Sequence, residues 1–131
     1  LFVADRLHHL LEPDEGVLHQ LEQVNHVLMD RYLFSSYAYQ GAHADLEWVI
    51  RANAESARLL LPDLCIYLDI SPEISLERLR EGREELELFE TLENLRKVHA
   101  MYMKILKRFG KEQEILIVDG SQPVDILSEI I

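Results

Sequence analysis

The stretch HVLMDRYLFSSYAYQG, residues 26–41, decides the fold class that the sequence predicts. It joins a short apolar run, which ends at Asp30 and Arg31, to a segment rich in serine and tyrosine. The apolar residues before Asp30 are too few for a helix and favour a buried strand over residues 26–31. Chemistry in an open α/β sheet collects just past the carboxyl ends of such strands. We therefore expect a functional site at Arg31, whose planar fork of donors suits a phosphate or a carboxylate.

Two further apolar runs, at residues 64–70 and 115–119, also predict buried strands. Helices are predicted at residues 1–11, 17–23, 44–61, 72–80, 90–109 and 123–131, with a loop at 32–43. This alternation predicts an α/β fold, a three-layer parallel sheet flanked by helices with right-handed crossovers. At 131 residues, we expect a single domain.

Three polar residues at or near the expected helices are interpreted from local chemistry. Ser71 is a good N-cap, because a proline and a glutamate follow it. Asp69, at the end of the strand predicted at 64–70, is either a site residue or a partner for that cap, and the second interpretation is favoured. Asn53 borders the buried stripe of the helix predicted at 44–61, where a helix-edge residue is favoured over a ligand.

Composition narrows the classes of partner. The formal net charge of −11 argues against non-specific nucleic-acid binding, although a local arginine cluster can still hold a small anion. No apolar run approaches the length that spans a membrane, and no signal peptide is visible. The six histidines show no metal-ligand spacing. The single cysteine, Cys65, cannot form an internal disulfide and favours a reducing, cytoplasmic location.

In order along the chain, four segments resemble successive blocks of the thymidylate kinases, which have the P-loop nucleoside-monophosphate kinase fold. These segments are LFVADR, DRYLFSSYAYQG, PDLCIYLDISPEISLERL and VDGSQP. The resemblance covers nearly the whole chain and implies transfer of the ATP γ-phosphate to dTMP, giving dTDP, with Mg²⁺. It also implies a homodimer through helices that include residues 1–11, although the apolar stripe there could equally face the core.

The P-loop of that family, a GxxxxGK[ST] element, occurs nowhere in these residues. The chain starts at Leu1, inside a helical pattern, so we expect the first strands and the P-loop to precede it. Because the P-loop is the main cradle for the ATP phosphates, we expect residues 1–131 alone to be inactive.

The resemblance assigns the thymine base to Phe2 and Arg6. Residues i and i+4 share a helix face, so Phe2 would stack on the pyrimidine while Arg6 reaches its edge. Arginine carries donors only, so Arg6 would suit O4 of thymine and oppose the N4 amine of cytosine. The plainer explanation of an isolated pair, a core phenylalanine beside a surface arginine, is outweighed by the DRY segment downstream.

The resemblance also assigns Asp30 and Arg31 to catalysis. Arg31 would hold the monophosphate, and Asp30 would lie near magnesium, as a ligand through water. The alternative is a surface ion pair at the end of a strand.

The segment after Arg31 lines the nucleoside in the family, which implies substrate binding by Ser35, Ser36, Tyr39 and Gln40. Ser36 would lie near the base, Gln40 would accept from thymine N3–H, and Tyr39 would pack under the deoxyribose, leaving little room for a 2′-hydroxyl. The alternative is a polar turn with two aromatic plugs, which is how Tyr32 and Tyr37 are interpreted.

The charged residues 81–89 resemble the lid of the family. Arg83 would neutralise the charge that develops on the transferred phosphoryl group. Leu88 stands where many bacterial members carry a lid arginine, so either Arg83 substitutes or an arginine of the P-loop takes the role.

Four residues are implied at ATP: Arg78 and Arg80 beside the lid, and Ser121 and Gln122 in the loop that borders adenine.

Two alternatives to a dTMP kinase stay open. One is a nucleotide-binding or dimerisation module without a P-loop and without kinase activity. The other is a related nucleotide kinase with a different acceptor. Arg6 argues against the second, because a cytidylate or guanylate enzyme needs other groups at the base edge.

Overall fold

A computed structural model describes residues 1–82 and 91–131 of the chain. The chain divides into two compact units, Leu1–Leu61 and Pro62–Ile131, which are described separately below as the first and the second unit.

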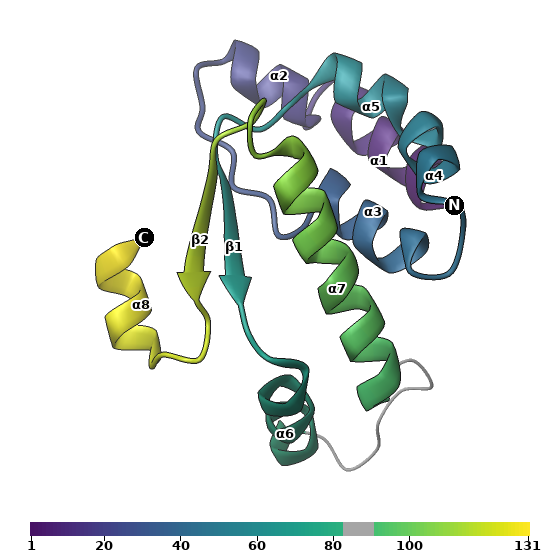
Figure 1. The fold of residues 1–131 in the computed structure, drawn as a ribbon. Coiled ribbons are helices and arrows are strands. Elements are labelled where there is room, and N and C mark those ends of the chain that lie inside the picture. The colour runs from purple at the N-terminus through teal and green to yellow at the C-terminus, as the bar shows by residue number, and fades with distance from the viewer. Residues whose placement is uncertain (83–90) are drawn as a thin grey trace. The chain divides into compact units, whose positions relative to one another are not determined.

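The first unit is built from helices (Figure 1). They are α1 (Phe2–Leu11), α2 (Val17–Glu22), α3 (Leu33–Gly41), α4 (Leu46–Ala52) and α5 (Ala54–Leu59). α1 packs against α2 and α5, while α4 packs against α3 and α5. The apolar core of this unit is formed by Leu10, Val17, Leu33, Phe34, Tyr37, Ala38, Leu46 and Val49.

The strand predicted at residues 26–31 is wrong. This segment has no regular structure, and Leu28 is 96% exposed. A strand requires a hydrogen-bonded neighbour as well as an apolar run, and within the described residues the sheet pairs only β1 with β2, both in the second unit.

The loop predicted at 32–43 is also wrong, because residues 33–41 form α3. Its buried residues are Leu33, Phe34, Ser36, Tyr37, Ala38 and Gly41. Most of these buried residues recur at helical spacing, which is a signal for a helix. The serines and tyrosines of the segment led to the prediction of a loop instead.

The helix predicted at 44–61 is broken at Asn53 into α4 and α5. The Asp45 carboxylate caps α4 by accepting from the backbone N–H of Trp48 at 2.7 Å. Asn53 is 0% exposed, so its interpretation as a helix-edge residue is wrong.

The second unit contains a two-stranded parallel sheet with helices. Its elements are β1 (Cys65–Asp69), α6 (Pro72–Gly82), α7 (Leu92–Phe109), β2 (Ile115–Asp119) and α8 (Val124–Ile130). The strands pair from Cys65 with Ile115 to Asp69 with Asp119. These elements confirm the strands predicted at 64–70 and 115–119 and, within about two residues at each end, the predicted helices.

Two polar predictions at the end of β1 have different outcomes. Ser71 is confirmed as a cap, since its Oγ accepts from the N–H of Ile74 at 3.3 Å. Asp69 was interpreted as a partner of that cap; instead its Oδ1 lies 2.8 Å from Nε2 of His99 on α7.

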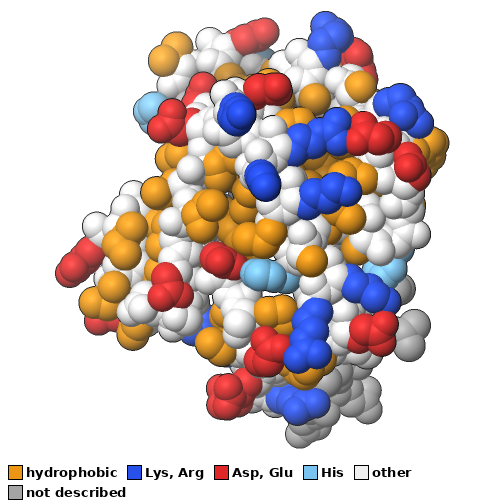
Figure 2. All heavy atoms as spheres, viewed as in Figure 1, with side chains coloured by type: hydrophobic (Ala, Val, Ile, Leu, Met, Phe, Trp, Pro, Cys, Tyr) orange, Lys and Arg blue, Asp and Glu red, His pale blue; other side chains and the backbone are white. Residues whose placement is uncertain are grey.

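α7 packs against α6, and its side chains also contact β1. The rings of Tyr67 on β1 and Tyr102 on α7 are 5.0 Å apart between centroids. The register places Leu68 and Ile117 on opposite faces of the sheet, and these side chains are 47% and 54% exposed. Hydrophobic side chains are correspondingly visible at the surface in Figure 2.

Candidate functional site

The guanidinium of Arg6 lies half-buried among side chains of the first unit. Its Nη1 donates to Oδ1 of Asn53, and its Nη2 donates to Oγ of Ser36. Its Cζ is 5.5 Å from the ring centroid of Tyr32. Burial lowers the pKa of Arg6, and neighbouring tyrosines and Asp5 partly oppose that shift. Within the described part of the chain, Arg6 forms no ion pair with a carboxylate.

Asn53 places an acceptor against Arg6 from the junction of α4 and α5. Its Nδ2 donates to the backbone carbonyl of Val49 at 2.8 Å, and its Oδ1 accepts from Arg6. Sequence reasoning missed this role. The available signal was a polar residue beside an apolar helical stripe, because a buried amide needs a hydrogen-bonding partner.

Tyr32 was also missed, because it was interpreted as a structural plug. Its single hydroxyl proton is shared between the backbone carbonyls of Ser56 and Leu60, which lie 3.2 and 3.1 Å from the hydroxyl oxygen. Burial raises the pKa of Tyr32, and the charge of Arg6 partly opposes that rise. The anchored ring provides a face for the Arg6 guanidinium.

Arg31 lies immediately before α3 in an unusual backbone conformation. Its φ is 69°, in the left-handed region that residues other than glycine seldom adopt. Its Cζ is 5.2 Å from the ring centroid of Tyr39. In the described structure, no side chain caps the N-terminus of α3. The N-terminus of a helix attracts anions through its dipole, so α3 and Arg31 together favour negative charge.

The structure groups the predicted base and nucleoside residues only in part. It brings Ser36 to Arg6 and Tyr39 to Arg31. Phe2 lies one helical turn before Arg6 on α1 and is 65% exposed. Ser35 and Gln40 lie on α3 and are half-buried, and Asp30 is exposed beside Arg31.

In the second unit, Arg78 on α6 contacts the loop that follows β2. Its Nη1 and Nη2 donate to the carbonyls of Gly120 and Ser121 at 2.9 and 3.1 Å. Asp119 accepts from the hydroxyl and N–H of Ser121 at 2.6 and 2.9 Å, and from the amide of Gln122 at 2.9 Å. These donors lower the pKa of Asp119 to about 2. The polar groups predicted at ATP therefore also hold this loop together.

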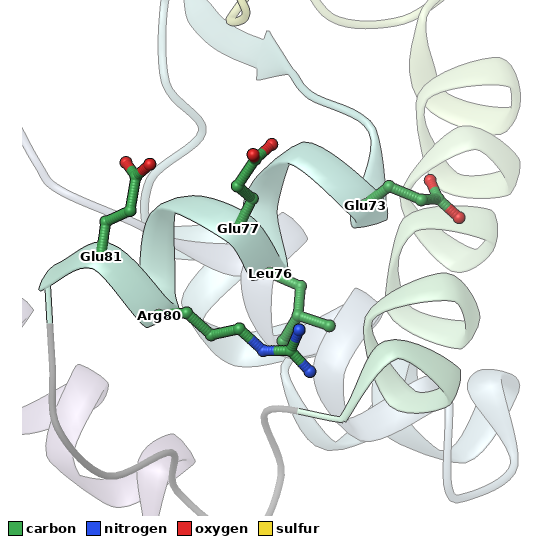
Figure 3. Close-up of a pocket in the computed structure, with 5 residues that line it drawn as sticks. All are labelled: Glu73, Leu76, Glu77, Arg80 and Glu81. Atoms are coloured by element: carbon green, nitrogen blue, oxygen red, sulfur yellow. The ribbon is translucent and has the colours of Figure 1, made fainter.

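Arg80 lines a shallow hollow on α6, about 420 Å³ in volume, with Glu73, Leu76, Glu77 and Glu81. Figure 3 shows Arg80 reaching toward Leu76, with Glu77 and Glu81 projecting from another side of the helix. Three carboxylates against one guanidinium make the lining net negative, so this hollow by itself does not favour a phosphate. Arg83 and residues 83–89 of the predicted lid lie outside the described residues.

The described residues contain no group of three or more histidine, cysteine or acidic side chains able to hold a metal ion. Magnesium bound with ATP needs only one or two protein carboxylates, because the phosphates supply other ligands. None of the described helices combines the length and the apolar character needed to cross a membrane.

Comparisons with known proteins agree on one family. The family model described as thymidylate kinase matches residues 1–131. A thymidylate kinase of Geobacillus thermodenitrificans is 40% identical, with 100% of this chain and 59% of the relative covered. A thymidylate kinase of Leptospira borgpetersenii is 38% identical, with 88% of this chain and 54% of the relative covered. A thymidylate kinase of Acholeplasma laidlawii is 34% identical, with 100% of this chain and 64% of the relative covered. The chain thus spans between about half and two thirds of the length of these relatives.

Proposed function

Because this chain belongs to the thymidylate kinase family, we propose that it is part of an ATP:dTMP phosphotransferase. In the reaction, an oxygen of the dTMP 5′-phosphate attacks the γ-phosphorus of ATP, and dTDP and ADP are formed. One observation carries the proposal most directly. The half-buried Arg6 hydrogen-bonds to the neutral side chains of Asn53 and Ser36, so a ligand acceptor is the natural complement to its remaining donors.

In this proposal, Arg6 donates to O4 of thymine, with Phe2 stacked on the ring. Cytosine offers an amine at the same place and would meet donor with donor. Ser36 takes part through Arg6, since its hydroxyl accepts from Nη2. Ser35 and Gln40 line the rest of the nucleoside from α3, and Tyr39 lies under the deoxyribose.

The monophosphate would lie at Arg31 and the N-terminus of α3. The left-handed backbone at Arg31 and the N-terminus of α3 both support this placement, because strained residues cluster at functional sites and helix N-termini attract anions. Asp30 would hold, through water, the magnesium that accompanies ATP. Magnesium would neutralise phosphate charge, and Arg31 would keep the acceptor phosphate in place.

The remaining proposals concern the donor side and the assembly. Arg78, Arg80, Ser121 and Gln122 would border ATP, and Arg83 would act on the transferred group. We further propose a single domain over residues 1–131 with a three-layer P-loop kinase sheet, acting as a cytoplasmic homodimer that binds no nucleic acid or membrane.

The test uses the protein expressed from its natural gene. With ATP and Mg²⁺, we expect conversion of dTMP to dTDP, measured by chromatography of the nucleotides. In thermal-shift measurements with dTMP, dUMP, dCMP and dGMP, we expect dTMP to stabilise the protein more than dCMP or dGMP. A preference for dCMP would exclude the role of Arg6, and absence of dTDP would overturn the activity.

A further inference from the structure

We propose that Asn53 is a positioning residue that sets the base preference of the site by fixing the Arg6 guanidinium. This inference rests on the proposed function, in which Arg6 meets the edge of the base. Asn53 itself is 0% exposed and would act only through Arg6.

The Asn53 amide has one favourable orientation. Its Nδ2 donates to the carbonyl of Val49, so its Oδ1 must face Nη1 of Arg6. A flipped amide would set an N–H₂ group against the Arg6 donor and an oxygen against the Val49 oxygen. The hydrogen bond that anchors one end of the amide therefore aims its acceptor at Arg6.

Asn53 lies at the break between α4 and α5. Its backbone has φ −100° and ψ 5°, and its N–H is shared between the carbonyls of Val49 and Ile50 at 3.2 and 3.1 Å. A buried amide in an interrupted helix is unfavourable unless it is hydrogen-bonded. Its contacts with Val49 and Arg6 meet that requirement.

Asn53 and Ser36 together fix the plane of the guanidinium. Each accepts from a different terminal nitrogen, so rotation of the Arg6 group would break at least one hydrogen bond. Of the five N–H groups of an arginine, three remain for other partners. Because asparagine is neutral, it orients Arg6 without compensating the positive charge that attracts a carbonyl oxygen.

The experiment measures dissociation constants by calorimetry for dTMP, dCMP and 2-deoxyribose 5-phosphate, which lacks a base. Asn53→Leu removes the acceptor at similar volume. We expect Asn53→Leu to reduce the preference for dTMP over dCMP by about tenfold, a loss typical of a mispositioned specificity contact. Binding of 2-deoxyribose 5-phosphate should not change.

Ser56→Ala is the matched control, because Ser56 is also 0% exposed and its hydroxyl has no hydrogen-bond partner in the described structure. It should leave the preference unchanged. In an Arg6→Ala background, Asn53→Leu should cause no further loss of preference. If Asn53→Leu does not fold, Asn53→Ser, which is too short to reach Arg6, serves the same test.

The outcomes separate the two proposals. If the unmodified protein shows no preference for dTMP over dCMP, the proposed function fails and this inference fails with it. If the unmodified protein shows the preference and the Asn53 variants retain it, only this inference is overturned. Equal weakening of dTMP and 2-deoxyribose 5-phosphate would also overturn it, since that result indicates a general structural role.

Discussion

At the residue scale, the positive charges of Arg6 and Arg31 lie in different surroundings. Each cationic group lies over a tyrosine ring, at 5.5 and 5.2 Å from the ring centroid. Arg6 is partly withdrawn from water and hydrogen-bonded, whereas Arg31 is exposed beside a helix N-terminus. The first arrangement favours a directed hydrogen bond to a neutral acceptor, and the second favours a solvated anion.

Arg31→Ala should weaken dTMP binding by about tenfold or more, because a hydrogen bond to a charged group contributes about 1.5–3 kcal/mol. Calorimetric titration with dTMP measures the change. Arg51→Ala, which removes an exposed arginine of the same unit at the end of α4, is the control. Equal affinities of the Arg31 and Arg51 variants would contradict the assignment of the monophosphate.

The carboxylate of Asp119 predicts a pH dependence. Its pKa is about 2 in the folded chain, because Ser121 and Gln122 donate to it, against an ordinary value of about 3.9. Its contribution to stability should therefore be complete above about pH 4 and should be lost as the pH falls from there toward 2. The difference in unfolding free energy between the unmodified protein and Asp119→Asn should be constant from pH 5 to 7 and should shrink below pH 4. A difference that grows on acidification would contradict this.

At the element scale, the second unit was predicted well, whereas in the first unit the helices predicted at 1–11 and 17–23 match α1 and α2 but the predictions for 26–31 and 32–43 are wrong. β1 and β2 have continuous apolar runs, α7 has a strong amphipathic pattern, and the start of α6 is marked by the cap at Ser71. The segment 26–31 has an apolar run but no strand neighbour in the described structure, and local pattern carries no information about neighbours. α3 was missed because its serines and tyrosines were given more weight than the helical spacing of its buried residues.

The same distinction explains the candidate site. Arg6, Arg31, Ser36 and Tyr39 were chosen from motifs, and the structure gives them contacts in the first unit. Asn53 and Tyr32 were missed because their partners lie far away in the sequence. Asn53 is buried and is 47 residues from Arg6, and Tyr32 is 24 residues from Ser56. No spacing rule within one helix reports such a contact.

Arg78 supplies a prediction about the junction of α6 with the loop after β2. Arg78→Leu keeps the apolar stem but removes both donors to the carbonyls of Gly120 and Ser121. We expect faster amide hydrogen exchange at residues 120–122, and a loss of at most about 1 kcal/mol in stability because Arg78 is an exposed residue. Arg80→Leu, on the same helix, is the control. Unchanged exchange in the Arg78 variant would contradict the role of this contact.

At the scale of the whole molecule, acidic and apolar surfaces coexist. The net charge is −11, yet Leu68 and Ile117 remain about half exposed on opposite faces of the sheet. The cationic groups of the candidate site are therefore local exceptions in an acidic chain. Such a chain binds a small anion through placed arginines rather than through its overall field.

Residues 1–131 expressed alone should turn over ATP very slowly, because the P-loop motif that cradles ATP phosphates does not occur in them. A coupled assay for ADP, with dTMP and Mg²⁺ present, measures this rate against that of the protein from its natural gene. Comparable rates for the two would show that phosphoryl transfer does not need that motif.

The way Asn53, Ser36 and Tyr32 hold Arg6 has a thermodynamic consequence for any nucleotide that binds there. A free arginine side chain loses up to about 2 kcal/mol of rotamer entropy when it is immobilised. Here most of that loss accompanies folding, so the guanidinium is preorganised before the ligand arrives. Calorimetry should accordingly find a smaller entropic penalty for dTMP than in a variant in which Arg6 moves freely.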